Sequence, residues 1–281
     1  MKTILFNDIV TAVADSCISA ACDLPADVAA AIKKSVALET DARGAKLINQ
    51  CIINAEIAHK DRIPICQDTG LAVVFAEIGT GVTIDGGTLT DAINAGVRQG
   101  YRQGYLRASV VSDPLYSRKN TGDNTPAIIH ISIISGSSLT ITIAPKGAGS
   151  ENKSALAMLT PADGIDGVKR LVIDTVIKAG GSACPPMVIG VGIGGNFEMA
   201  PLLAKKALLR TIGSINPDQR YANLEQELLD LCNATNVGPQ GLGGSTTALA
   251  VHIEQLPCHI ASLPVAVNIN CHVARHISIT L

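Results

Sequence analysis

The heptapeptide Pro64-Ile65-Cys66-Gln67-Asp68-Thr69-Gly70 places a thiol, an amide and a carboxylate side by side between a proline and a glycine. These end residues disfavour a regular helix, so the segment is expected to be a loop that presents its side chains. Cysteine is a soft metal ligand, and its neighbours can hydrogen-bond a substrate. A single cysteine is more often a small buried hydrophobe, so the role of Cys66 depends on what else converges on it.

Composition indicates a globular chain of one large domain or two. Its 281 residues are 47% hydrophobic but only 2% aromatic, which leaves Ala, Val, Ile and Leu to fill the core. The formal net charge of -2 provides no basic footprint for nucleic acid or for an anionic membrane surface. We therefore expect neither class of partner.

The N-terminal residues lack the pattern of a signal peptide, because only a short apolar run separates Lys2 from Asp8. We expect no transmembrane helix, since no uninterrupted apolar run approaches the required length. These observations predict a cytoplasmic location.

The eight cysteines favour metal binding, catalysis or burial over a disulfide framework. No Cys-x-x-Cys pair is present, which excludes a zinc ribbon or a thioredoxin-type motif. Five cysteines are assigned to packing, most of them because they fall within amphipathic helical patterns: Cys17, Cys22, Cys51, Cys232 and Cys258.

The pattern along the chain predicts a mixed α/β fold, with a helical part over about residues 1–62 and an α/β part over about 63–281, a β-sheet core with packed helices. In the first part, Asn7 is expected to cap one helix, Pro25 to begin a second, and Thr40 or Asp41 to open a third. Residues 107–126 have the composition of a loop throughout.

The remaining expected elements follow from apolar runs and turn residues. We expect strands at 71–78, 187–191, 246–253 and 263–269, helices at 89–104, 163–179, 197–210 and from 216 onward, and a hairpin of strands 127–134 and 139–144. Ser150 is expected to cap a helix through Met158. The glycines before it would leave backbone N–H groups free to meet an anion.

Two nucleotide-binding patterns are rejected. Gly190-x-Gly192-x-x-Gly195 matches a dinucleotide fingerprint in a glycine turn, but the helix after it does not lead to a second strand ending in an acidic residue. The run from Gly238 to Ser245 resembles a phosphate loop, but Gly244 stands where the lysine must be.

A better constellation is formed by Cys66, Cys184 and Cys271, each in a segment flanked by Gly, Pro or Asn. Three remote cysteines can meet only through the tertiary fold, and three thiolates suit zinc with a fourth ligand or an iron–sulfur cluster. With three cysteines, one iron of a four-iron cluster keeps an open position and can act as a Lewis acid.

The chain resembles the class I (iron–sulfur) fumarate hydratases and the related L-tartrate dehydratases, specifically the α subunit of the two-chain forms. The resemblance covers nearly the whole length. It rests on segments 65–70, 120–126, 146–154, 183–195, 238–244, 259–264 and 271–272. The segment 149–154 looks like the fumarase type, and tartrate dehydratase is the alternative.

The resemblance implies reversible hydration of fumarate to (S)-malate at a [4Fe–4S] cluster held by Cys66, Cys184 and Cys271. It also implies an α₂β₂ assembly, since the family's catalytic threonine and further carboxylate-binding cations belong to a β part, and only ten residues follow Cys271 (281 − 271 = 10). The remaining site residues it implies are Asp68 and His259 in catalysis, and Gln67, Arg107 and the backbone near Gly149 in substrate binding.

Each of these residues has a simpler reading. Asp68 could be a turn former, Arg107 a surface charge and His259 a structural histidine. Two other classes of protein remain open: a non-catalytic iron–sulfur protein that carries electrons or senses, and a three-cysteine zinc hydrolase.

Overall fold

The computed structural model describes residues 2–281. The fold is mixed α/β, as the sequence predicts. It divides into two compact units: unit 1 contains residues 1–25, 55–148 and 275–281, and unit 2 contains 26–54 and 149–274. The helical N-terminal part is shared between them, because α1 (Phe6–Cys22) belongs to unit 1, α2 (Ala26–Leu38) to unit 2, and α3 (Ala42–Asp61) has residues in both.

Unit 1 is built on a four-stranded sheet of order β10-β5-β2-β4. Strand β2 pairs in parallel with β4 and antiparallel with β5, which pairs antiparallel with β10. A separate parallel pair joins β1 to β3. The bounds are β1 Lys2–Leu5, β2 Leu71–Gly79, β3 Val82–Asp85, β4 Ile128–Ile134, β5 Leu139–Lys146 and β10 Ile277–Thr280.

The expected hairpin of β4 and β5 is wrong, because β2 lies between these strands. The turn that joins them crosses the end of β2 and bonds to it: Gly81 N–H donates to Gly136 O, and Gly79 N–H to Ser138 O. The turn at these residues is predicted correctly, but it hydrogen-bonds to a segment that is distant in sequence.

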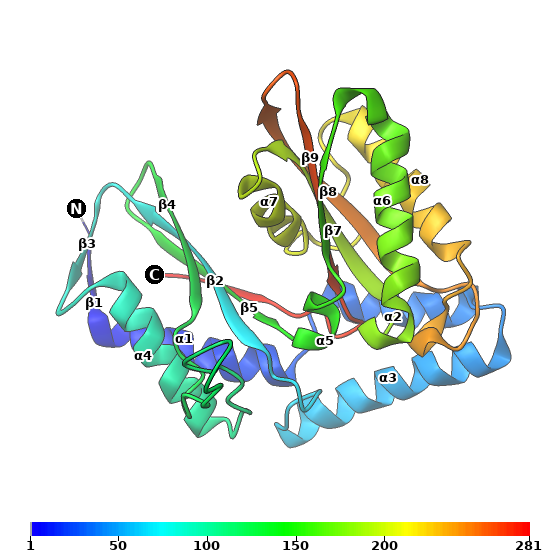
Figure 1. Ribbon diagram of the computed structural model, residues 1–281. Coiled ribbons are helices and arrows are strands. Elements are labelled where there is room, and N and C mark those ends of the chain that lie inside the picture. The colour runs from blue at the N-terminus through cyan, green and yellow to red at the C-terminus, as the bar shows by residue number, and fades with distance from the viewer. Residues whose placement is uncertain (1) are drawn as a thin grey trace. The chain divides into compact units, whose positions relative to one another are not determined.

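Helices α1 and α4 (Leu89–Gln103) pack on one face of this sheet (Figure 1). Their contact is close because of two glycines in α4: a Cβ on Gly96 would lie 2.8 Å from Val10 O, and one on Gly100 would lie 2.6 Å from Ala14 O. The buried cluster between helices and sheet is aliphatic except for Cys17 and Tyr101 among the described residues, and the partly buried Phe6 packs against it.

The stretch Phe6–Leu38 is long and apolar enough to cross a membrane by length and composition, in contrast to the expectation that no such helix is present. This is weak support for a membrane span, because core helices pass the same test. In the structure the stretch is two helices, and α1 buries Ile9 and Val13 completely in the core of unit 1.

Unit 2 is built on a second four-stranded sheet of order β6-β9-β7-β8, with β7 and β8 parallel and the other pairs antiparallel. Helices α6 and α8 cover one face and α7 covers the other (Figure 1). The bounds are β6 Ala155–Leu159, α6 Gly164–Ala179, β7 Met187–Gly195, α7 Met199–Ala207, α8 Gln219–Asn233, β8 Ala248–Cys258 and β9 Leu263–Asn270.

The expected glycine turn at 190–195 is instead part of β7. A Cβ on Gly190 would lie 2.0 Å from Ala204 O, and one on Gly192 would lie 2.0 Å from Ala200 O. These glycines therefore let α7 approach the strand at backbone distance, which is a packing role rather than phosphate binding.

The helix expected from Ser150 through Met158 is also wrong. Only the single turn α5 (Ala148–Glu151) forms, and the next residues become β6, which pairs with β9. The apolar residues of 155–159 suit either a short helix or a buried strand, and pairing with a distant strand decides the outcome.

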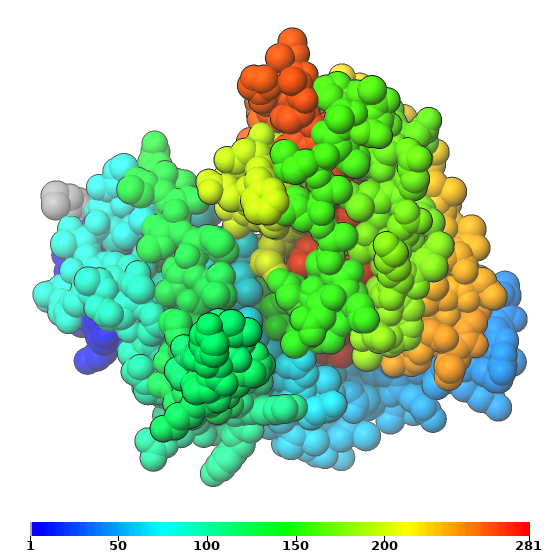
Figure 2. Space-filling model, viewed as in Figure 1, coloured from blue at the N-terminus to red at the C-terminus, as the bar shows by residue number. Residues whose placement is uncertain are grey.

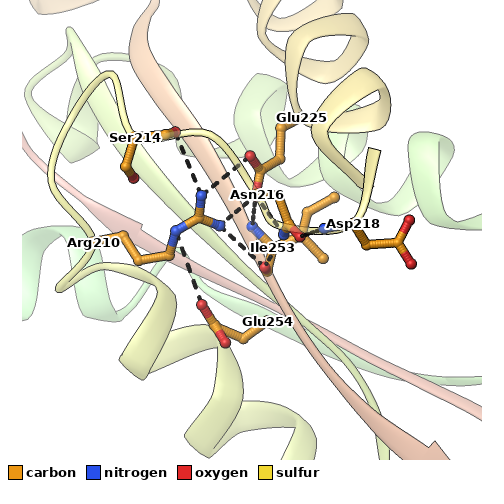
Figure 3. Close-up of polar contacts among 7 residues, drawn as sticks. All are labelled: Arg210, Ser214, Asn216, Asp218, Glu225, Ile253 and Glu254. Atoms are coloured by element: carbon orange, nitrogen blue, oxygen red, sulfur yellow. Dashed lines mark hydrogen bonds and ion pairs between the residues drawn. The ribbon is translucent and has the colours of Figure 1, made fainter. Parts of the chain in front are cut away.

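Strand β8 lies at the edge of the unit 2 sheet, and side chains around an ion pair bond the outward-facing backbone groups of Ile253 (Figure 3). Glu225 accepts hydrogen bonds from Arg210 and from Ile253 N–H, while Asn216 donates to Glu225 and to Ile253 O. Because Glu225 is only 7% exposed, these bonds supply the partners that its buried carboxylate requires.

Candidate functional site

The Cys66 segment lies in unit 1 between α3 and β2, and buried side chains hold its backbone. Tyr101 Oη donates to the carbonyls of Thr69 and Gly70, at 3.0 and 2.9 Å. Asn124 Nδ2 donates to Gly70 O at 3.1 Å. The loop that the sequence predicts is therefore held in a defined conformation.

The Asp68 carboxylate is oriented by two backbone amides. Its Oδ1 accepts from Gly70 N–H at 3.1 Å, and its Oδ2 accepts from Ala148 N–H at 2.8 Å. Asp68 N–H in turn donates to Cys66 Sγ at 3.4 Å. Gln67 is exposed, and its Oε1 lies 3.7 Å from Cys66 Sγ.

Arg107 lies in the long loop of unit 1 that precedes β4. Its backbone carbonyl accepts from Thr69 Oγ1 at 2.9 Å, so its main chain is tied to the Cys66 segment. The residue is exposed, which leaves the guanidinium accessible to an anionic ligand. The structure thus brings Cys66, Gln67, Asp68 and the Arg107 backbone together.

Cys184 lies in unit 2, three residues before β7, and is exposed. Its φ of 50° is a left-handed conformation, unusual for a residue with a side chain. A cysteine that is exposed and held in such a conformation is unlike a packing residue, because free cysteines are among the most buried residue types.

Cys271 follows β9 directly and lies at the same end of the sheet as Cys184, since Val188 of β7 pairs with Asn270 of β9. His272 connects the two cysteine segments. Its backbone N–H donates to Cys184 O at 3.2 Å, and its Nδ1 lies 3.0 Å from the same carbonyl. A carbonyl only accepts, so this contact assigns the ring proton to Nδ1.

Gln240 and Cys51 also belong to this end of unit 2, and sequence reasoning missed both. Gln240 Nε2 donates to Pro185 O at 2.8 Å and lies 3.4 Å from His272 Nδ1 and 3.9 Å from Cys51 Sγ. Burial, with the nearby thiols of Cys184 and Cys271, raises the pKa of Cys51 to about 11. Cys51 is therefore a mainly protonated thiol that packs beside the pair.

Gly149 is exposed and begins the unit 2 segment that follows β5. A Cβ at this position would lie 3.5 Å from Ser182 O, so the glycine lies against the turn that leads to Cys184. Glu151, two residues later, pairs with Lys205 of α7 and accepts from Asn268 of β9.

His259 lies in the loop between β8 and β9, which stands out from the surface of unit 2 (Figure 2). It is exposed, and its Nδ1 accepts from Ala261 N–H at 3.1 Å. Strand β9 separates it from Cys271, and eight residues of strand span roughly 26 Å. Within unit 2, the structure therefore does not bring His259 to the cysteine pair.

The other cysteines divide into two groups. Cys17, Cys22 and Cys232 are buried, as predicted, and burial raises the pKa of Cys17 and of Cys232 to about 12. The packing role expected for Cys258 is wrong, because this last residue of β8 is exposed, and its Sγ donates to Ser262 O at 3.2 Å.

The three predicted ligands differ from the buried cysteines in being accessible: Cys184 is exposed, and Cys66 and Cys271 are partly exposed. Such thiols suit a metal or an iron–sulfur cluster. Across residues 2–281 the structure contains no set of three or more His, Cys, Asp or Glu side chains arranged to hold a metal ion. Cys66 belongs to unit 1 and the pair to unit 2, so their joint coordination of a cluster stays a prediction.

Comparison with known proteins gives consistent matches over almost the whole chain. The sequence model of the family "Fumarate hydratase (Fumerase)" matches residues 10–280. A protein of Methanocaldococcus jannaschii, named "Putative L(+)-tartrate dehydratase subunit alpha", is 43% identical over 261 residues, which cover 91% of each chain.

The L(+)-tartrate dehydratase subunit alpha of Escherichia coli (strain K12) is 31% identical over 254 residues, which cover 90% of this chain and 84% of the relative. The subunit of the same name from Shigella sonnei matches equally well. Because both the family model and these relatives span nearly all of both units, the chain belongs to the fumarate hydratase (Fumerase) family.

Proposed function

We propose that this hydro-lyase subunit is the α subunit of an iron–sulfur enzyme that reversibly hydrates fumarate to (S)-malate. The observation that carries the proposal is that the exposed Cys184 and the partly exposed Cys271 lie together at one end of the unit 2 sheet, while Cys66 lies partly exposed in the loop that carries Asp68. These three residues would hold a [4Fe–4S] cluster. When bound, the cluster supplies an open iron that acts as a Lewis acid on the substrate hydroxyl.

The chain's own residues would bind and orient the dicarboxylate. The exposed guanidinium of Arg107 can pair with a substrate carboxylate in fork geometry, and the exposed amide of Gln67 can donate to it. Backbone N–H groups near Gly149 add further donors. Asp68, held by two amides, would assist the base that removes the carbon-bound proton.

The partner would be a β subunit, in an α₂β₂ assembly in the cytoplasm that serves the tricarboxylic acid cycle. The relatives are named as α subunits, which supports a two-chain enzyme. The family's base, a threonine, would come from the β subunit. His259 is proposed to contact substrate; within unit 2 it lies at the opposite end of β9 from Cys271.

The second candidate is dehydration of L(+)-tartrate. The names of the relatives support it, at 43% identity for the archaeal protein. Fumarate hydration is supported by the family model and by the resemblance of segment 149–154 to the fumarase type. Both reactions remove or add water at a hydroxy-dicarboxylate, so the same residues serve either one.

The test is anaerobic reconstitution of the chain with ferrous iron, sulfide and a co-produced β subunit, followed by assays on fumarate, (S)-malate and L(+)-tartrate. We expect iron with acid-labile sulfide and interconversion of fumarate and malate. Faster turnover of tartrate would select the second candidate. Zinc without sulfide would refute the iron–sulfur proposal and favour a zinc hydrolase.

Asp68→Asn separates the enzyme from a non-catalytic iron–sulfur protein. We expect the cluster spectrum to persist while hydration falls by about 10²-fold, the usual contribution of one acid–base group. Unchanged hydration would remove Asp68 from the mechanism. The matched control is Asp85→Asn at the end of β3, which should leave both readouts unchanged.

A further inference from the structure

Arg275 of unit 1 is a buried cation that the proposed reaction does not use. It lies four residues after Cys271 in the sequence and is only 4% exposed. Its Nη2 donates to Asp68 O at 2.8 Å. Its Nε and Nη1 are buried without a hydrogen-bond partner among the residues that the structure describes.

A buried arginine is costly unless its donors and its charge are compensated. A single bond to one backbone carbonyl could be made by a neutral or smaller donor, with no charge buried. The chain nevertheless places a full guanidinium here, buried beside the carbonyl of Asp68. Arg275 therefore serves as a strong, charge-assisted hydrogen-bond donor to Asp68 O rather than as a packing side chain.

The bond to Asp68 O completes a regular pattern. The carbonyls of three consecutive residues are held by buried side chains of unit 1. Arg275 donates to Asp68 O, and Tyr101 donates to Thr69 O. Tyr101 and Asn124 both donate to Gly70 O. We name these three side chains the carbonyl clamp. Arg275 holds the carbonyl of Asp68 itself, two residues after Cys66, and is the only charged member.

We propose that Arg275 is a positioning residue for the hydro-lyase reaction, holding the main chain at Asp68 so that the Asp68 carboxylate and the Cys66 sulfur keep a fixed relation. The catalytic consequence rests on the proposed function, whereas the effect of Arg275 on the main chain at Asp68 does not. Arg275 is not proposed to touch the substrate or the cluster. It acts through the backbone of the segment that carries both groups.

The structural half is tested by hydrogen–deuterium exchange on the full chain without cluster. Arg275→Met removes the donor and keeps the volume. We expect amide exchange at residues 68–70 to rise by at least about 10-fold while α4 stays protected. Arg275→Lys, which keeps a charged donor, should restore most of the protection. Arg102→Met, at an exposed arginine near the end of α4, is the control and should change nothing.

The catalytic half uses the reconstituted α–β enzyme. A displaced catalytic group costs up to about 10²-fold in turnover, so Arg275→Met should lower kcat by that order with KM within about three-fold, and Arg275→Lys should recover most of kcat. Unchanged exchange at 68–70, or a raised KM with kcat intact, would overturn the proposal. If the wild type hydrates no substrate, the proposed function fails, and the exchange experiment still decides the role of Arg275.

Discussion

The two units support their predicted cluster ligands in different ways. In unit 1, Cys66 lies in a loop whose carbonyls are held by the carbonyl clamp, three side chains that are each at most 4% exposed. In unit 2, Cys184 and Cys271 lie at the ends of adjacent strands, and Gln240 and His272 connect them through half-buried contacts. One ligand segment is fixed by side chains, the other two by strand pairing.

This difference predicts different sensitivities. A loop held by buried polar side chains loses its conformation when one donor is removed, because the freed carbonyl stays buried and unpaired. Strand ends keep their positions through the sheet, so loss of one connecting side chain should matter less. Four substitutions, ordered from the largest expected effect, sharpen or break this comparison.

Cys184→Ser should have the largest effect. Removing a proposed ligand should lower bound iron and reduce hydration to below about 10⁻³ of the parent, since the Lewis acid is lost. Iron and sulfide analysis of the reconstituted enzyme, with activity, measures this. Cys258→Ser, at another exposed cysteine, is the control, and equal losses in both variants would contradict the ligand assignment.

Asn124→Ala tests unit 1. Asn124 is completely buried, donates to Gly70 O and accepts from Ser109 N–H, so the substitution leaves Ser109 N–H unpaired and Gly70 O with Tyr101 as its remaining donor. Alanine is also disfavoured at the φ of 59° at this position. We expect the free energy of unfolding to fall by about 3 kcal/mol. Urea unfolding at neutral pH gives the value, and a loss below about 1 kcal/mol would show that the carbonyl clamp contributes little to stability.

Gln240→Asn tests unit 2. Asparagine tolerates the left-handed φ of 54° at this position but is too short to reach Pro185 O. The expected loss is only about 1 kcal/mol, because the strand ends persist. A loss as large as that of Asn124→Ala would show that both units depend equally on side-chain connections.

Asp123→Asn should have the smallest effect, and one that depends on pH. Burial opposes ionisation of Asp123, but hydrogen bonds from Arg98 and Thr125 outweigh it and lower the pKa to about 2. A lowered folded pKa stabilises the protein above the unfolded value near 4 and loses this effect as pH falls toward 2. Because Arg98 is about half exposed, screening limits the contribution to about 0.5–1 kcal/mol at pH 7.

The measurement is urea unfolding of the wild type and Asp123→Asn across pH 2–7. The two proteins should differ at pH 7 and converge as pH falls from about 4 to 2. A constant difference over the whole range would mean that the ion pair does not contribute.

The sequence predicted most long elements, because their apolar periodicity is local. Helices α4 and α6 and strands β2 and β9 form within one residue of the expected bounds, and α2 and α3 begin within two residues of the expected starts, whereas β8 runs five residues beyond its expected end. What it missed depends on distant partners. Strand β2 lies between the strands expected to form a hairpin, and segment 155–159 became strand β6 rather than helix because β9 lies beside it. The four-residue strands β1, β3 and β10 are too short for a periodicity to show.

The same distinction applies to the candidate site. Cys66, Cys184 and Cys271 were found from their turn-rich flanks and from the family resemblance. Gln240, Cys51 and Arg275 were not, because their contacts join residues 189 positions apart in one case and 207 in the other. The only local signals were the glycines around Gln240 and the short distance in sequence from Cys271 to Arg275.

The two glycines of β7 that contact α7 affect residues outside the sheet as well. Gly190 and Gly192 let α7 lie directly on the strand, so even a methyl group added there must lift the helix. Lys205 of α7 holds Glu151, and Glu151 also holds Asn268 of β9. Displacing α7 would therefore disturb the turn that begins at Gly149, so that a change deep in the sheet would reach the backbone that is proposed to bind a substrate carboxylate.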